Sequence, residues 1–408
     1  MIDNFRTKKP LLFDITCSLI VAVLFSAFIY MEHYLTSVKL LNTLFGILAL
    51  GGLLYISKRS VLMAGFAIGI LWFYWVGYSF EYNSVGYLTP IVIFIFGIIY
   101  MLFFGTLALT NKVYIRALLL FGLSFFEPAD WNWMQIELLF IDSYIGIYKY
   151  QLAIVLASLS LIKYLNKPYN YASLLLIILA FNFSTPEQKD ASLKIKLVST
   201  NITQDIKWKR EIMPSTVSNL FNEIDLAVKE NYDLILFPET VLPMFLNKSP
   251  HLLNQLSHVS KKITIVMGSL LQEDGNNYNV TYMFQNGDYQ IAKKLVLVPF
   301  GEYIPLPKFM RKIINDTFFA GASDFLTADS PTDFIIKGIK FRNAICYEAT
   351  CKEIYEGDVE FVLASSNNAW FAPSIEPTIQ KLLMQYYARK NGTTIYHSAN
   401  YKGTGIIK

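Results

Sequence analysis

The stretch "STPEQKDAS", residues 184–192, separates two parts of the sequence that differ in character. Before it, long hydrophobic segments follow one another with short connectors, whereas after it short apolar runs alternate with charged and turn-forming residues. The stretch itself is polar and contains a proline, as segments between domains commonly do. We therefore predict two domains, residues 1–185 and residues 186–408.

The composition of the whole chain points to a membrane. With 54% hydrophobic and 16% charged residues and a mean hydropathy of +0.38, it is too apolar for an ordinary soluble protein of 408 residues. The net charge of +4 is small and spread along the chain, which argues against a nucleic-acid partner. Three cysteines, Cys17, Cys346 and Cys351, do not make the disulfide framework of a small secreted domain.

The N-terminal part is predicted to be a helical membrane bundle of about seven spans. Most of them approach the roughly 20 apolar residues that cross a hydrocarbon core, and the fifth is short enough to be a re-entrant segment. The first has basic residues before it but no small-residue cleavage site, so we interpret it as retained. The predicted spans are residues 11–31, 40–56, 61–80, 87–109, 116–126, 148–165 and 169–184.

The basic residues of the connectors predict the orientation of this bundle. With a cytoplasmic N-terminus, the inside connectors hold nine Lys and Arg residues, whereas the outside connectors hold Lys39 and Lys149 only. Seven crossings then place everything after residue 185 on the outer side of the membrane. The outer connector "FEPADWNWMQIELLFI", residues 126–141, has two interpretations: Trp131 and Trp133 anchor it at the headgroups, or they form a lip through which lipids enter.

The C-terminal part alternates strand-like runs with amphipathic helices, which predicts an α/β layer architecture. It has neither a glycine-rich phosphate loop nor histidines at metal-binding spacing, so we expect no cofactor and no metal. The predicted helices cover residues 215–232 and 377–392. The predicted strands lie in residues 193–202, 233–240, 263–270, 280–284, 290–298, 333–348, 359–366 and 393–400.

Three polar residues, Glu239, Lys294 and Cys346, stand at or near the ends of these apolar runs. Each has an ordinary interpretation, namely a solvated strand end, a surface lysine and a core cysteine. Active sites of open α/β folds, however, gather at the carboxyl ends of strands. Together the three would supply a nucleophile, a base for its proton and a cation for a tetrahedral intermediate, which favours acyl transfer or amide chemistry.

Four blocks in order carry a family resemblance: "FPET" (237–240), "KLVLVPFGEYIP" (294–305), "ICYE" (345–348) and "SSNNAWF" (365–371). They resemble the nitrilase-type domain of the bacterial apolipoprotein N-acyltransferases, and the preceding hydrophobic half is similar in layout. The resemblance implies an α-β-β-α sandwich in which Glu239 is the general base, Lys294 stabilises the oxyanion and Cys346 is the nucleophile. It also implies supporting roles for Glu302, Tyr347, Glu348 and Trp370.

The reaction that the resemblance implies is a ping-pong acyl transfer in the bacterial inner membrane, with the catalytic domain on the periplasmic side. A phospholipid donates an acyl chain to Cys346, and the thioester passes it to the α-amino group of a diacylglyceryl-cysteine at a lipoprotein N-terminus. The implied enzyme is a monomer without a cofactor. A site beside the bilayer suits these substrates, since exposing an acyl chain to water costs roughly 0.8 kcal/mol per CH₂.

The sequence departs from the family pattern near its C-terminus. Family members usually continue past the "TGIIK" block (404–408) with further strands and a last transmembrane helix, which puts the closure of the sandwich in question. Tyr387 and Lys390 stand where the family commonly has Arg and Glu, and His397 where it has Arg, while Asn400 matches. The alternatives are a membrane-tethered carbon–nitrogen hydrolase acting on a small amide, and a transporter or receptor whose outer domain only binds a ligand.

Overall fold

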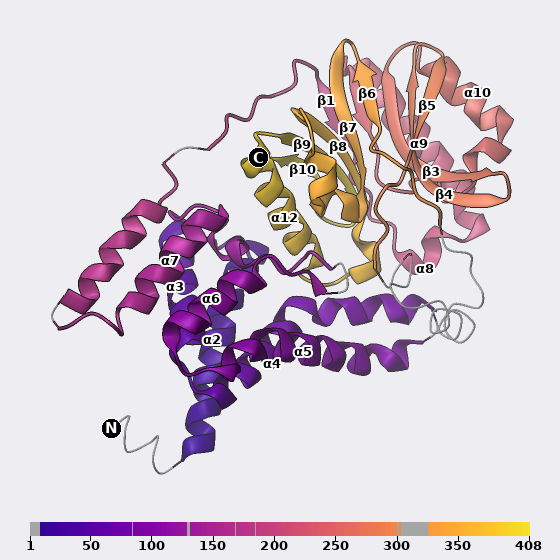
Figure 1. The fold of residues 1–408 in the computed structure, drawn as a ribbon. Coiled ribbons are helices and arrows are strands. Elements are labelled where there is room, and N and C mark those ends of the chain that lie inside the picture. The colour runs from indigo at the N-terminus through magenta and orange to yellow at the C-terminus, as the bar shows by residue number, and fades with distance from the viewer. Residues whose placement is uncertain are drawn as a thin grey trace. The chain divides into compact units, whose positions relative to one another are not determined.

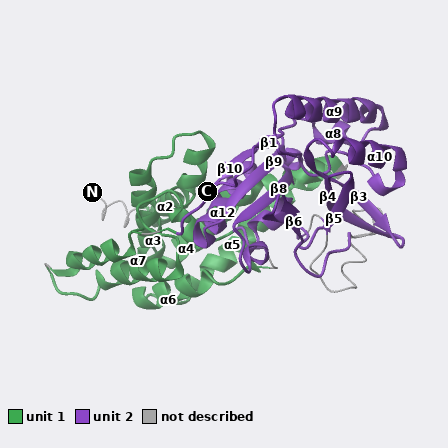
Figure 2. Cartoon of the chain, turned by 90° about the horizontal axis from the view of Figure 1, so that it is seen from above, with its two compact units in different colours: residues 1–128, 134–185 green, residues 129–133, 186–408 purple. Residues whose placement is uncertain are grey.

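The structure, a computed structural model, describes residues 9–83, 85–128, 131–167, 169–183, 185–299, 302 and 325–408. The chain divides into two compact units (Figure 2). The first comprises Met1–Pro128 and Met134–Thr185, and the second comprises Ala129–Trp133 and Pro186–Lys408. Five residues from the connector between the fifth and sixth predicted spans thus belong to the C-terminal unit.

The first unit is helical in its described residues. Three helical stretches are long and apolar enough to cross a membrane, Pro10–His33, Lys58–Tyr82 and Gly86–Leu109. The other predicted spans form apolar helices of 10–17 residues, which is shorter than a full crossing requires. The elements are α2 (Pro10–His33), α3 (Lys39–Tyr55), α4 (Lys58–Phe73), η1 (Tyr74–Asn83), η2 (Gly86–Leu88), α5 (Thr89–Gly105), η3 (Thr106–Leu109), α6 (Val113–Leu123), η5 (Ile136–Phe140), α7 (Lys149–Leu161) and η6 (Tyr169–Ala180).

Helices α4 and α5 pack with their backbones in close approach. A Cβ atom added at Gly65 would lie 2.6 Å from the Tyr100 carbonyl oxygen, and one at Gly69 would lie 2.5 Å from that of Phe96. Small residues four apart are a common means of packing helices in membranes, where no hydrophobic effect drives the association.

Arg116 is one of the nine basic residues counted above in the inside connectors. It is buried and donates hydrogen bonds to the carbonyls of Leu54 and Ile56, so it satisfies backbone acceptors at the C-terminal end of α3.

The second unit holds two five-stranded sheets in its described residues, with strand orders β1-β2-β3-β4-β5 and β10-β9-β8-β7-β6 (Figure 1). In each sheet three strands run parallel and the others pair antiparallel. The strands are β1 (Ile195–Leu197), β2 (Leu234–Leu236), β3 (Thr264–Glu273), β4 (Asn276–Gln285), β5 (Asp288–Lys293), β6 (Asp333–Ile336), β7 (Ile339–Ile345), β8 (Phe361–Asn367), β9 (Thr394–Asn400) and β10 (Gly405–Ile407).

Alternation along the strands builds the layers. In β2, Leu234 and Leu236 face a core that includes Phe341 and Leu363 of the other sheet, whereas Ile235 packs in a core with the helices of the opposite face. The helices of this unit are α8 (Gln204–Lys207), η7 (Arg210–Ile212), α9 (Met213–Lys229), η8 (Leu246–Lys248), α10 (Pro250–Val259), η9 (Cys346–Thr350), η10 (Lys352–Tyr355), η11 (Asn368–Phe371) and α12 (Glu376–Asn391).

Helices α9 and α10 cover the outer face of the first sheet, and α12 lies against β9 and β10 of the second (Figure 1). The α-β-β-α sandwich expected from the resemblance is therefore confirmed. One predicted run, 333–348, is instead the hairpin β6–β7, because Lys337 and Gly338 both adopt the positive φ that a tight hairpin turn requires. The predicted run 290–298 ends its strand at Lys293, which leaves Lys294 just beyond β5.

Candidate active site

Cys346 lies at the bend between β7 and η9. β7 runs parallel to β8, with Ile345 opposite Ser365, so the thiol follows the carboxyl end of a buried parallel strand. Its φ of +57° is in the left-handed region, where a residue with a Cβ stores roughly 1–3 kcal/mol of strain. Such strain persists only where the surrounding structure fixes it, and it turns this side chain out of the strand.

Glu239 lies beyond the end of β2 in a similar bend, since the next residue, Thr240, has a φ of +45°. β3 passes directly against this bend at Gly268. A Cβ at that position would lie 2.4 Å from the Thr240 nitrogen and 2.7 Å from the Glu239 Cα, and both are backbone atoms that cannot rotate away. Gly268 is thus required for the position of the Glu239 carboxylate.

We expect Gly268→Ala to shift Glu239, to lower the activity of the site at least about tenfold and to cost roughly 1–3 kcal/mol of stability. Reaction rates and thermal midpoints of the purified protein in detergent measure the two effects. Gly405→Ala is the matched control, because a Cβ there meets nothing within 4 Å. Full activity in Gly268→Ala would show that the position of Glu239 is not critical.

Lys294 is 1% exposed and lies among carboxylates. Its Nζ is 2.8 Å from Oε1 and 2.7 Å from Oε2 of Glu302, and 3.7 Å from Oε1 of Glu239. Asn279 donates to Oε1 of Glu239 at 2.8 Å and to Oε1 of Glu302 at 3.3 Å. Burial lowers the pKa of Lys294, but the two carboxylates raise it above its usual value, so the ammonium stays charged.

The thiol of Cys346 lies within the electrostatic reach of this group. Burial and the charge of Glu239 raise its pKa well above the usual value, and Lys294 acts in the opposite direction. The resting group is therefore a neutral thiol rather than the thiolate that proximity to a lysine favours. Reaction then requires a base that removes the proton as the sulfur attacks.

Glu348 connects the segment after Lys294 to the bend at Cys346 through hydrogen bonds. Its carboxyl group accepts hydrogen bonds from the backbone N–H groups of Leu295, Val296 and Ile345, the last at 2.6 Å. Burial raises its pKa to about 7. Of the supporting residues predicted from the resemblance, Glu302 forms an ion pair with Lys294, and Glu348 accepts the backbone hydrogen bonds just described. Trp370 lies in η11 and is partly exposed.

Tyr347 is covered by the part of the connector that belongs to this unit. The rings of Trp131 and Trp133 stack with its ring at centroid distances of 5.8 and 6.2 Å. Asn132 donates to the Thr350 carbonyl at 2.6 Å, and Trp133 donates to the Thr350 hydroxyl at 2.9 Å. Both tryptophans are buried against η9, the helical turn that begins with Cys346, rather than exposed at a surface.

Lys207 is a residue of the site that sequence reasoning missed. It is 4% exposed and donates to the Glu239 carbonyl oxygen at 3.1 Å, and it lies within electrostatic range of the Glu239 carboxylate and the Cys346 thiol. Burial lowers its pKa to about 8. It lies in the four-residue helix α8, and its neighbours show no strand or helix periodicity that marks it.

We expect Lys207→Met to lower the activity of the site about 10- to 100-fold, because the site loses a positive charge within electrostatic range of the thiol. The rate of Cys346 alkylation by iodoacetamide measured against pH isolates this effect, and its midpoint should move to higher pH. Lys209→Met removes an exposed lysine of the same segment and should change neither quantity. An unchanged alkylation profile in Lys207→Met would refute an electrostatic role.

His397, which stands where the family commonly has Arg, is fully buried in β9. Nδ1 lies 2.8 Å from the Gly403 carbonyl oxygen, so it carries the proton, and Nε2 accepts from the Ser366 hydroxyl at 2.8 Å. Burial lowers its pKa to about 4 from the usual 6.5. The folded protein therefore holds a neutral imidazole at the end of the second sheet.

This histidine predicts a loss of stability in acid. As the pH falls from about 6.5 towards 4, the unfolded chain binds a proton that the folded chain excludes, so the free energy of unfolding drops by about 2 kcal/mol by pH 5. Thermal midpoints at pH 7.5 and 5 should differ less in His397→Gln than in the unmodified protein. His251→Gln, at an exposed position of α10, is the control. An equal pH effect in His397→Gln would assign the acid sensitivity to other groups.

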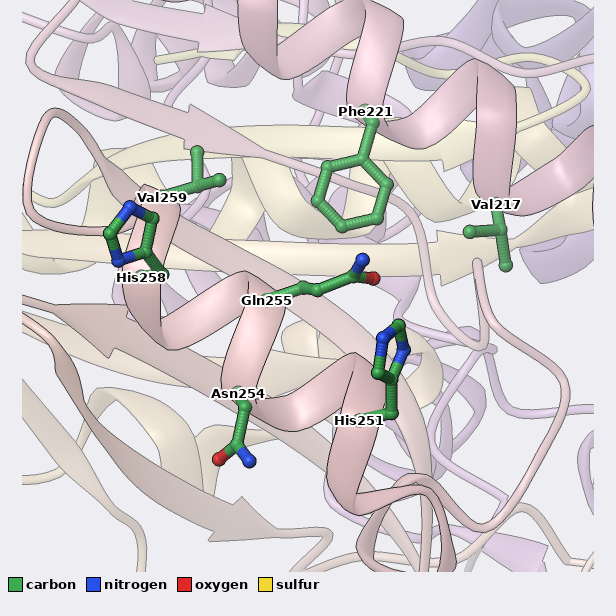
Figure 3. A pocket seen from close by; sticks show the side chains of 7 residues that line it. All are labelled: Val217, Phe221, His251, Asn254, Gln255, His258 and Val259. Carbon is green, nitrogen blue, oxygen red and sulfur yellow. The ribbon is translucent and has the colours of Figure 1, made fainter.

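A pocket of about 610 Å³ lies elsewhere in this unit, between α9 and α10 (Figure 3). It is lined by Val217, Phe221, His251, Asn254, Gln255, His258 and Val259. None of the residues discussed above as catalytic lines it. In the described part of the chain, no group of three or more His, Cys, Asp or Glu side chains could hold a metal ion.

The sandwich, with a buried glutamate, a buried lysine and a half-buried cysteine beyond strand ends, is the arrangement expected of a carbon–nitrogen hydrolase in the broad sense. Residues 166–402 match the model of the family Carbon-nitrogen hydrolase, and residues 12–183 match that of the Apolipoprotein N-acyltransferase integral membrane domain. The chain is 42% identical to the apolipoprotein N-acyltransferase of Wolinella succinogenes over 99% of its own length and 97% of the relative's. It belongs to the apolipoprotein N-acyltransferase family.

Two further relatives of the same name are similar over most of their length. The Helicobacter pylori protein is 36% identical, with 90% of this chain and 87% of the relative covered, and the Campylobacter jejuni protein is 32% identical, with 99% and 92% covered. The chain is thus an integral membrane N-acyltransferase of the carbon–nitrogen hydrolase superfamily. Membership of this family argues against the two alternatives considered above, namely a membrane-tethered amidase and a transporter or receptor.

Proposed function

We propose that this enzyme moves an acyl chain from a phospholipid to the α-amino group of a lipoprotein's diacylglyceryl-cysteine through a thioester on Cys346. The observation that carries the proposal is the position of Lys294, a buried ammonium group between Glu239 and Glu302 whose charge acts on the Cys346 thiol. Because one chain supplies all these groups, we propose a monomer as the working unit.

In the first half-reaction, Glu239 takes the thiol proton as the sulfur attacks the ester carbonyl carbon. Lys294 stabilises the negative charge on the carbonyl oxygen in the tetrahedral intermediate. The C–O bond then breaks, Glu239 gives its proton to the departing alkoxide, and a lysophospholipid leaves. The acyl chain remains on sulfur as a thioester.

In the second half-reaction, the amine attacks the thioester carbon while Glu239 takes one of its protons. The C–N bond forms, the C–S bond breaks, and the proton passes from Glu239 to the departing sulfur. Lys294 again stabilises the oxyanion. Both substrates are anchored in a membrane, so a catalytic unit attached to a helical membrane domain avoids transferring acyl chains into water.

We propose further that the catalytic unit lies on the outer, periplasmic side of the cytoplasmic membrane. The connectors support this through their bias of basic residues, which remains eight against two when the buried Arg116 is left out. Labelling of a cysteine introduced at the exposed position 262 by a membrane-impermeant maleimide in intact spheroplasts tests the orientation. Labelling only after lysis would place the unit inside.

The mass of a lipoprotein N-terminal peptide tests the reaction itself. Incubation with phospholipid and a diacylglyceryl peptide should add the mass of one acyl chain to the peptide, on its α-amino group. An amidase that uses the same residues with water as the acceptor adds none. A peptide mass that stays unchanged, together with ammonia release from a small amide, would favour that alternative.

A further inference from the structure

Helix α12 begins with a carboxyl group that the reaction described above does not use. Glu376 is 1% exposed, and one of its carboxyl oxygens has no hydrogen-bond partner among the residues that the structure describes. One turn later on the same face of the helix, Gln380 places its Nε2 3.9 Å from the Cys346 sulfur. The carboxyl group of Glu376 also lies within electrostatic range of Cys346 and Glu239.

A buried carboxyl oxygen without a partner is costly. Leaving such a group unsatisfied destabilises the folded protein, so its presence one helical turn from the side chain that contacts the Cys346 sulfur points to a ligand. Burial, followed by the charge of Glu239, raises the pKa of Glu376 well above its usual value, so the group is a neutral acid at neutral pH. A neutral carboxyl still offers a carbonyl oxygen as an acceptor.

The two half-reactions differ by one hydrogen-bond donor. When a primary amine attacks the thioester, its lone pair faces the carbonyl carbon and one N–H faces Glu239. The second N–H stays on nitrogen and needs an acceptor of its own. The alcohol released in the first half-reaction has a single O–H, which Glu239 supplies, so that step leaves no donor unpaired.

We propose that Glu376 accepts the hydrogen bond from this second N–H and is the contact that makes the site specific for a primary amine as acyl acceptor. The inference rests on the proposed function, since it assigns the acceptor contact of that reaction. Glu376 exchanges no proton in the step. Gln380, whose Oε1 is held by Asn368 at 3.0 Å, points its donor at the sulfur that leaves.

The experiment separates the half-reactions in the full-length protein in detergent–phospholipid micelles. Thioester formation is followed by intact mass spectrometry after phospholipid is added, and aminolysis is followed after a diacylglyceryl peptide is added. We expect Glu376→Leu to form the thioester within about threefold of the unmodified rate and to pass it on about 10- to 100-fold more slowly, since a buried donor loses its acceptor.

Glu376→Gln keeps a carbonyl oxygen at this position and should restore aminolysis to within about threefold. Glu356→Leu, at an exposed position, should leave both rates unchanged. The inference fails if Glu376→Leu passes the acyl chain on at the unmodified rate, if it slows both half-reactions equally, or if Glu376→Gln does not restore aminolysis. If the unmodified enzyme forms no thioester, the proposed function fails as well, so the two failures are distinguishable.

Discussion

Cys346→Ala is expected to abolish acyl transfer, with a rate at least about 10⁴-fold below that of the unmodified enzyme. Among the described residues of the site, the other side chains are carboxylates, protonated lysines and amides, and none of these forms a thioester. Transfer of a labelled acyl chain from phospholipid to a diacylglyceryl peptide measures the loss. A Cys346→Ala protein with more than about 1% of the unmodified rate would exclude covalent catalysis by this residue.

Cys351→Ala is the matched control for this prediction. Cys351 is buried, and its sulfur donates to the Tyr347 carbonyl oxygen at 3.4 Å, so it belongs to the packing beneath the nucleophile's helical turn. We expect its loss to lower the thermal midpoint slightly and to leave acyl transfer within a few-fold. Equal losses in the two variants would point to a structural effect of removing either thiol.

Lys294→Met is expected to reduce acyl transfer by at least about 10³-fold, because the oxyanion loses its cation. It should also destabilise the protein by about 3–5 kcal/mol, since the buried carboxylate of Glu239 and the half-buried carboxylate of Glu302 lose the cation between them. The transfer assay and the thermal midpoint in detergent measure these effects separately. The double variant Lys294→Met/Glu302→Gln should recover much of the stability and none of the activity.

The neighbouring lysine provides the control. Lys293 pairs with Glu273 at 2.5 Å, but Glu273 is exposed and Lys293 only half-buried, and a pair at the surface contributes at most about 1 kcal/mol. Lys293→Met should therefore change neither the rate of acyl transfer nor the thermal midpoint appreciably. If Lys294→Met lost stability but kept its activity, Lys294 would be a structural counter-ion only.

Much of the fold could be predicted from the sequence because its signals are local. The polar stretch at 184–192 marks the change in composition. The continuous apolar run Leu234 to Leu236, whose side chains point alternately to the two faces of the sheet, marks a strand that is buried on both faces. Residues at the ends of such strands were sound candidates for the site. Glu239 and Lys294 illustrate this, since both stand just beyond a strand and lie 3.7 Å apart.

What could not be predicted depends on contacts between distant segments. Lys207 and Glu239 are 32 positions apart, and nothing in "DIKWK" indicates a buried lysine. Glu376 reads as an ordinary acidic residue in the first turn of a helix until Gln380 is seen beside the thiol. Trp131 and Trp133 look like membrane anchors in the sequence, because hydropathy does not reveal that their rings stack with the ring of Tyr347.

The central claim is tested most directly by mass spectrometry of the enzyme after incubation with phospholipid and without an acceptor. We predict a peptide that contains Cys346 and carries one acyl chain, which hydroxylamine removes and which disappears when a diacylglyceryl peptide is added. An acyl chain on another residue, or transfer to the acceptor without an acylated Cys346 at any time, would contradict the mechanism.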